Sequence, residues 1–356
     1  MGLPEILIEF KQRAETAVQR SENGIVAMIL KDDTKTGDEF TSYAYSTAAD
    51  IDNTHWSATN QKYLNSVFES APNRVLVERT ATTGTYETAL ARLRNKSWNY
   101  LAIPGLQKAE VEDIGEWIIA QRAAGKTFKA VLPCTAAEYS ANDEGIIDFA
   151  TEGIKAGAYS FTSYEFCARI AGLIASLPMT ESATYQVLAE VDSITESTTP
   201  DEDIDGGKLI LINDGEKIKV ARGVNSLHII SGDKTEDMKK IKIIDGMDLI
   251  RDDIRTTFEE NYIGINNSYA NKLIFISAVN QYFDTLVRQG VLYDQYENLA
   301  EIDVDAQREW LAEKYDVSSY TDDQIRTART GSYVFARASI QFNDAIEGLH
   351  FSINME

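Results

Sequence analysis

The stretch RVLVERTATTGTYETALARLRNKSWNYLAIPGLQKAEVEDIGEWIIAQRAAGKTFKAVLP, residues 74–133, determines the fold class. It contains three short apolar runs, at residues 74–79, 100–103 and 128–132. Apolar residues at helical spacing lie between these runs, and Gly125 and Pro133 stand where elements are expected to end. Short strands that alternate with helices of ten or more residues are typical of a parallel sheet covered by helices. The stretch therefore predicts an α/β fold.

The flanking sequence extends this pattern in both directions. Residues 25–30 form a near-continuous apolar run, which is typical of a strand that is buried on both faces. Helical spacing predicts helices near residues 57–70 and 166–177, and Thr85 is a candidate cap for the helix that follows it. We expect residues 24–182 to form one α/β domain with a mostly parallel central sheet and flanking helices.

Residues 183–232 have a different character, and we interpret them as a small β-rich element. Strand-like runs occupy residues 185–191, 208–212, 217–221 and 227–230. Asn213-Asp214-Gly215 has the chemistry of a tight turn between two of them. The run DEDIDG at 201–206 matches the start of a calcium-binding loop, but Ile212 stands where a bidentate Glu is required. This favours a solvated acidic loop.

Residues 233–330 predict a C-terminal α+β domain. A short strand is expected at 242–244, followed by helices at about 248–260 and 268–289. A further strand and two short helices then lead to the end of the chain. The whole is thus α/β, or α+β overall, and the chain ends in strands that are available for exchange.

Both ends of the chain carry the period-two alternation of a strand with one apolar face. The last segment, residues 331–356, contains two such runs, 334–342 and 349–355, separated by a break. A polar tether, residues 11–23, separates the N-terminal run from the rest of the chain. A terminal strand with an apolar face must pair with something. We expect these strands to pair between subunits through six apolar residues: Ile6, Ile8, Phe10, Leu349, Phe351 and Ile353.

Composition narrows the classes of partner. The formal net charge is −22, and such a surface repels phosphate backbones, so we expect no nucleic-acid partner. No run of about 18 apolar residues occurs, so we expect no direct membrane insertion. Cys134 and Cys167 are predicted to be free, buried small hydrophobes in a reducing compartment.

The sequence contains no recognisable catalytic constellation, and we predict no catalytic, cofactor-binding or metal-binding residue. His55, His228 and His350 are isolated from one another in the sequence. The loop Thr80–Thr85 lies between a strand and a helix, where phosphates often bind, but it lacks the lysine and the first glycine of a P-loop. An α/β nucleotide-binding protein or enzyme that uses strand-end loops near Gly84 is the alternative function.

Four segments carry a resemblance to a known family. They are LPEILIEF at 3–10, GIVAMILKD at 24–32, KIIDGMDLIRDDIR at 242–255 and FNDAIEGL at 342–349. In their order and spacing over the whole length, the chain resembles the short contractile-tail sheath proteins of bacteriophages, defective prophages and phage-tail-like bacteriocins. The family's central region is subtilisin-like in fold, but this chain has no serine-protease motif there, so the resemblance implies no activity.

The resemblance implies a structural function. Sheath subunits stack as hexameric rings around a tail tube, their terminal arms complete the sheets of neighbouring subunits, and contraction drives the tube through a bacterial envelope. The implied partners are other copies of the chain, the tail tube protein, and baseplate and tail terminator proteins, with no cofactor. The implied location is a virion or phage-tail-like particle assembled in the host cytoplasm. The expected parts are an N-terminal arm and tether (1–23), an α/β domain (24–182), a β-rich element (183–232), a C-terminal sheath domain (233–330) and a segment of C-terminal strands and arm (331–356).

Overall fold

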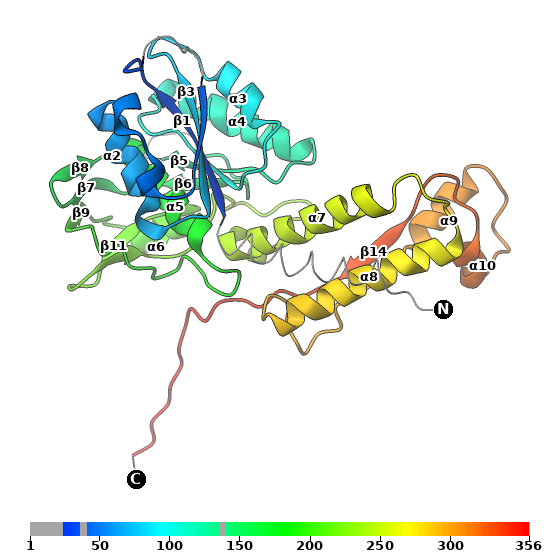
Figure 1. Ribbon diagram of the computed structural model, residues 1–356. Helices are drawn as coiled ribbons and strands as arrows, with labels where there is room; N and C mark the ends of the chain where they lie inside the picture. The colour runs from blue at the N-terminus through cyan, green and yellow to red at the C-terminus, as the bar shows by residue number, and fades with distance from the viewer. Residues whose placement is uncertain (1–23, 36–40, 135–139, 356) are drawn as a thin grey trace. The chain divides into compact units, whose positions relative to one another are not determined.

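The computed structural model describes residues 24–35, 41–134 and 140–355 (Figure 1). These residues form two compact units, which are described separately below. The larger unit contains residues 24–245 and 345–355, and the smaller unit contains residues 246–344. The five-part division expected from the sequence stays a prediction.

A seven-stranded sheet forms the centre of the larger unit. Its strands, in spatial order, are β10 (Lys208–Leu209), β6 (Ile146–Phe149), β5 (Lys129–Pro133), β4 (Tyr100–Ala102), β1 (Ile25–Lys31), β3 (Arg74–Thr80) and β2 (Thr41–Tyr45). Every pairing is parallel except that of β2 with β3. The predicted mostly parallel sheet is therefore confirmed, with one antiparallel edge strand that the sequence did not indicate.

Helices cover both faces of this sheet. The helices of the first face are α2 (Ala58–Val67) and α5 (Ser163–Ser176), and those of the second are α3 (Glu87–Leu93) and α4 (Val111–Ala123). The alternation along β1 explains the two cores, because Val26 and Met28 pack on the first face while Ala27 packs on the second. The predicted cap Thr85 is wrong, since α3 begins after Tyr86.

Among its described residues, the larger unit also contains two small sheets and several short helices. A three-stranded sheet contains β7 (Glu152–Ala156), β8 (Tyr159–Phe161) and β9 (Ser193–Thr195), and the predicted hairpin joins β11 (Leu211–Asn213) to β12 (Ile218–Val220). Short 3₁₀ helices occupy Ala48–Asp50, Asn53–His55, Phe68–Ser70, Lys108–Glu110 and Glu236–Lys239.

Three segments of this unit differ from their predicted conformation. Residues 185–191 do not form the predicted strand, because Tyr185 has a positive φ of 60° and only the single bridge Val187–Lys219 forms. Residues 227–230 are likewise irregular. The acidic run at 201–206 is not a loop, since most of it lies in the short helix α6 (Pro200–Asp205), which begins at a proline.

The smaller unit consists of helices and one two-stranded antiparallel sheet. Its elements are α8 (Tyr269–Arg288), β13 (Leu299–Ile302), α9 (Val304–Ala312), α10 (Asp322–Thr327) and β14 (Ala336–Ser339), together with most of α7 (Ile241–Asn261). Phe275 of α8 packs edge-on against Phe258 of α7 and against Tyr262, which directly follows α7. The predicted strand at 242–244 is wrong, because these residues form the first turn of α7.

Candidate assembly surface

The first alternating run of the terminal segment pairs within its own chain. β14 is antiparallel to β13, with Leu299 opposite Ser339 and Ala300 opposite Ala338. The pairing continues beyond the strand, because the Tyr293 N–H donates to the Gln341 carbonyl at 2.7 Å and the Asp303 N–H donates to the Phe335 carbonyl at 3.1 Å. The predicted terminal strand at 334–342 is thus confirmed over its central part.

The outer edge of β13 is closed by a side chain of α8. The Asn280 amide donates to the Ala300 carbonyl at 3.0 Å, and the Ala300 N–H donates to the Asn280 amide oxygen at 2.6 Å. This reciprocal pair of bonds imitates the contact that a neighbouring strand would make. At Ala300, the backbone groups on this edge are therefore already satisfied, and a further strand could not pair there without displacing Asn280.

The outer edge of β14 is not closed in this way. In an antiparallel pair, opposed residues alternate between those whose backbone groups face each other and those whose groups face outward. Because Ala300 faces Asn280, its partner Ala338 directs its N–H and carbonyl away from β13, and so does Ala336 two residues earlier. Both alanines are exposed, as are Arg337 and Ser339. β14 thus presents outward-directed backbone groups that a further strand can pair with.

The two faces of this sheet differ in chemistry. Ala300 and Ile302 lie on the face that packs against α8, and both are buried. Their cross-strand partners Ala338 and Ala336 share that face but remain exposed. A strand added at the β14 edge would place alternate side chains beside these two alanines. That position suits apolar side chains.

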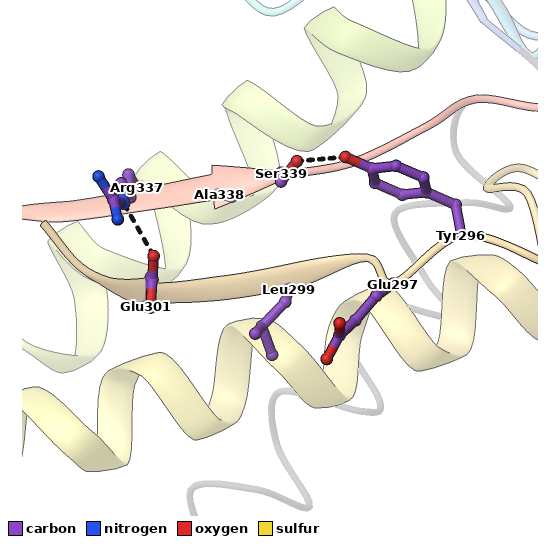
Figure 2. Close-up of a pocket in the computed structure, with 7 residues that line it drawn as sticks. All are labelled: Tyr296, Glu297, Leu299, Glu301, Arg337, Ala338 and Ser339. Atoms are coloured by element: carbon purple, nitrogen blue, oxygen red, sulfur yellow. Dashed lines mark hydrogen bonds and ion pairs between the residues drawn. The ribbon is translucent and has the colours of Figure 1, made fainter.

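The other face carries polar groups around a pocket of about 370 Å³ (Figure 2). Glu301 and Arg337 are cross-strand partners joined by an ion pair of 2.8 Å, and Arg337 also bonds to Asp305 at 2.9 Å. The hydrogen bonds to Glu301 and Asp305 raise the pKa of the Arg337 guanidinium above its usual value. Tyr296 and Ser339 share a further hydrogen bond across the pocket (Figure 2). This face suits the polar side chains of an added strand.

The terminal segment is fixed where β14 and its extension end. The Asn343 N–H donates to the Val291 carbonyl at 2.9 Å. Its side-chain amide donates to the carbonyls of Gly290 and Leu292 at 3.0 and 2.9 Å. Phe342 lies against Gly246 so closely that a β-carbon there would stand 2.6 Å from the ring. Asn343 therefore fixes the end of the β14 extension to residues 290–292.

The C-terminal arm, defined here as residues 346–355, follows this point. Leu349, Phe351 and Ile353 are 84%, 75% and 74% exposed, and no strand is assigned to any arm residue (Figure 1). The sequence predicts a strand here, whereas within a single chain the described arm is unpaired. Its assignment as an inter-subunit strand stays a prediction. The matching candidates Ile6, Ile8 and Phe10 lie outside the residues that the structure describes.

The strand-end loop of the alternative function is occupied by an acidic group. The carboxylate of Asp33 accepts hydrogen bonds from the Thr82 N–H, at 3.1 Å, and from the Thr82 hydroxyl. A phosphate at this loop would have to displace or approach a carboxylate. A second strand-end loop follows β4, and its Gly105 N–H already donates to the Tyr164 carbonyl. In the first loop, the Gly84 N–H also has a partner, the Ala81 carbonyl, so donors that a phosphate would use are already engaged in both loops.

The remaining candidates have structural contacts. Cys134 and Cys167 are buried and outside any disulfide, as predicted, and burial raises the pKa of the Cys167 thiol well above its usual value. The ring of His55 pairs with Asp52, and His228 bonds to the Ser226 carbonyl. Among the described residues, no group of three His, Cys, Asp or Glu side chains is placed to hold a metal ion. None of the described helices is long and apolar enough to cross a membrane.

Sequence reasoning missed three residues that hold this region in place. Asn280 bonds to the edge of β13, Asn343 holds the end of the β14 extension, and Glu347 bonds to Arg222 of the larger unit. The latter two lie in the break between the alternating runs, and the break itself was the available signal. Asn280 lies inside a long helix, where an asparagine is unremarkable.

Comparisons with known proteins agree along the chain. Residues 79–226 match the phage tail sheath protein central domain, and residues 233–356 match the phage tail sheath C-terminal domain. The tail sheath protein of Clostridium phage phiCD119 is 36% identical over 367 residues, which cover 99% of each chain.

Solved structures share the fold at low identity. The sheath tail protein of Listeria innocua has a TM-score of 0.71 at 14% identity, over 95% of this chain and 99% of that one. A chain of the anti-feeding prophage helical sheath in the contracted state has a TM-score of 0.70 at 12% identity, over 94% of each chain.

Proposed function

The chain belongs to the phage tail sheath family, and we propose that its subunits polymerise by inserting the C-terminal arm of one copy beside β14 of a neighbouring copy. One observation carries this proposal. The same chain has an open strand edge at Ala336 and Ala338 and an exposed amphipathic run at Leu349–Met355 that lacks a strand partner in the described structure. The edge offers outward-directed backbone groups, and the run is a strand pattern that can pair with them.

The two faces of the arm match the two faces of the sheet. Leu349, Phe351 and Ile353 would lie beside Ala336 and Ala338, while His350 and Ser352 would lie beside the polar pocket. Burying each large apolar side chain contributes about 1.5–3 kcal/mol, and each new backbone hydrogen bond contributes about 0.5–1.5 kcal/mol. The side chains therefore contribute at least as much as the backbone, and the backbone bonds set the register.

Asn280 would restrict this pairing to one edge of the sheet. Because its amide occupies the β13 edge at Ala300, a neighbour's arm has one edge of this sheet to pair with. A sheet that accepted strands on both sides would permit competing connections between subunits. Closing one edge favours a single connection that repeats at every junction of the assembly.

We propose further that the assembly is a contractile sheath of stacked hexameric rings around a tail tube. Support comes from the shared fold of a helical sheath in the contracted state and of a chain from the anti-feeding prophage baseplate. Exchanged arms would keep subunits connected while their bodies move relative to one another. The partners would be further copies, a tube protein, and baseplate and terminator proteins, in a virion or tail-like particle assembled in the host cytoplasm.

We propose a structural function without catalysis. The strand-end loops that a nucleotide would use carry Asp33 and an internally bonded Gly105, and the family is that of a structural tail component. Calorimetric titration with common nucleotides tests this point. Micromolar binding that is lost on replacing Thr82 would favour the alternative function.

The decisive test compares the full chain with a chain that lacks residues 349–356. At high concentration the full chain is expected to form tubes in negative-stain micrographs and to sediment as polymer. The shortened chain is expected to remain a folded monomer with an unchanged thermal transition. Normal tubes from the shortened chain would overturn the proposed role of the arm.

A further inference from the structure

One residue of the C-terminal arm is not free. Ile346 is 98% exposed and Leu349 is 84% exposed, yet the side chain of Glu347 between them is only 11% exposed. One carboxylate oxygen of Glu347 accepts two bonds from the Arg222 guanidinium, at 3.0 and 2.8 Å. The other accepts a bond of 2.6 Å from the Thr184 hydroxyl. Among residues 346–355, Glu347 alone makes a hydrogen bond to another described residue.

The groups that hold Glu347 are themselves fixed. The Thr184 hydroxyl accepts bonds from the Ser182 hydroxyl, at 3.0 Å, and from the Gly223 N–H, at 2.9 Å. A hydroxyl has one proton to donate and two lone pairs, so its full capacity is used when it also donates to Glu347. Arg222 directly follows the segment in which the Ala221 N–H donates to the Ile210 carbonyl. The site is therefore preorganised for a carboxylate.

We infer that Arg222 and Thr184 form a latch for Glu347 that fixes the root of the C-terminal arm and directs its free strand toward a neighbouring subunit. The inference rests on the proposed function, because it concerns how the exchanged strand is presented. The nine residues from Gly348 to Glu356 span at most roughly 30 Å when extended. Fixing their root confines the strand to a small volume and raises its effective concentration at a neighbour's β14 edge.

The latch is expected to be modest in strength and sensitive to salt. Bonds from a guanidinium to a carboxylate are charge-assisted and therefore stronger than neutral ones. Arg222, however, is 48% exposed, so solvent and ions screen the pair. A latch of this strength can hold the arm in the free subunit and still release it when the sheath changes its geometry.

The rate at which a glutamate-specific protease cleaves after Glu347 reports whether this residue is held in the latch. The assay uses the unassembled subunit. Cleavage after Glu347 requires its side chain to enter the protease, which the latch prevents, and it releases the peptide GLHFSINME. Arg222→Gln in the full chain is expected to release this peptide about three to ten times faster than the parent chain. Arg329→Gln is the matched control, because Arg329 is exposed and has no ion pair among the described residues. Equal rates for Arg222→Gln and the parent chain would overturn the latch.

Charge reversal at Arg222 tests whether the latch affects the rate of assembly. Arg222→Glu is expected to slow tube formation, followed by light scattering, about fivefold or more relative to the control Arg329→Glu. Adding Glu347→Arg to Arg222→Glu restores the opposite charges and is expected to return the rate to within about twofold of the parent chain. Failure of the double variant to recover would show that Arg222 does not act through Glu347.

The two hypotheses fail in different ways. If deletion of residues 349–356 leaves assembly intact, strand exchange is wrong, while the protease assay still reports whether Glu347 is held. If the deletion abolishes assembly but Arg222→Glu assembles at the parent rate, strand exchange stands and the latch has no role in it. Thermal unfolding of each variant, expected to match the parent chain, excludes loss of the fold as the cause.

Discussion

Two runs near the end of this chain have the same alternation but differ in whether they pair with another strand. Residues 334–342 find a partner in β13 and form β14 with its extension, whereas residues 349–355 remain exposed and unpaired within the described chain. Both carry alternating apolar side chains. The difference shows that alternation specifies a face but not a partner. The partner is determined by which strand edges the rest of the molecule leaves open.

The two edges of the β13–β14 sheet, to which a further strand could pair, also differ from each other. At Ala300 the edge is satisfied by Asn280, while at Ala338 the equivalent groups point outward. A helix side chain thus distinguishes two edges that are otherwise alike in backbone chemistry. The variants below test this distinction and the distinction between the two runs.

Proline substitutions in β14 are expected to have the largest effect. Ala338→Pro removes an N–H that points away from β13, so pairing within the chain is kept and the added strand is blocked. We expect this variant to melt close to the parent temperature and to form no tubes. Arg337→Pro removes an N–H that faces β13 and also the ion pairs to Glu301 and Asp305, so it is expected to weaken pairing within the chain and to melt below the parent temperature. Tubes formed by Ala338→Pro would contradict the open-edge assignment.

Truncation of the arm's largest apolar side chain is expected to have the next largest effect. Phe351→Ala removes about 1.5–3 kcal/mol of burial at each junction, which corresponds to a rise of roughly tenfold or more in the concentration needed for assembly. Ser352→Ala, on the opposite face, is the control and is expected to change that concentration little. Sedimentation over a concentration series measures both. Equal effects from the two variants would indicate that the arm does not bury one face.

Opening the closed edge is expected to have the smallest effect on assembly. Asn280→Ala leaves the Ala300 N–H and carbonyl without their partners, at a cost of about 1–3 kcal/mol in stability. Tubes should still form, but the second edge should add irregular aggregates that electron micrographs can distinguish from tubes. A variant with unchanged stability and only regular tubes would mean that Asn280 does not close the edge.

The central sheet and its helices could be predicted from the sequence because burial on both sides leaves strong local patterns. The apolar run at Ile25–Leu30 and the helical spacing of α5 require no knowledge of distant residues. The errors occurred where tertiary contacts override local preference. The β-branched residues Ile243 and Ile244 suggest a strand, yet both are buried as part of α7. Tyr185 adopts a left-handed conformation that no alternation pattern indicates.

The assembly surface could be predicted only in part. The alternation of the arm is local and therefore visible in the sequence, and Leu349, Phe351 and Ile353 are exposed. Their pairing with a neighbouring subunit stays a prediction. The edge that we propose to receive the arm could not be identified, since the difference between the two edges of the sheet depends on Asn280 lying beside Ala300, twenty residues away in the sequence. The latch was hidden for the same reason, because Glu347 and Arg222 are separated by 125 positions.

The most direct test of strand exchange is a cryo-EM structure of the assembled tube at a resolution that shows side chains. We predict that residues 349–355 form a strand beside Ala336 and Ala338 of a neighbouring subunit, with Phe351 on the face shared by those alanines and Asn280 still bonded to Ala300. An arm that is paired with its own subunit, or that lies on a neighbour away from β14, would contradict the account.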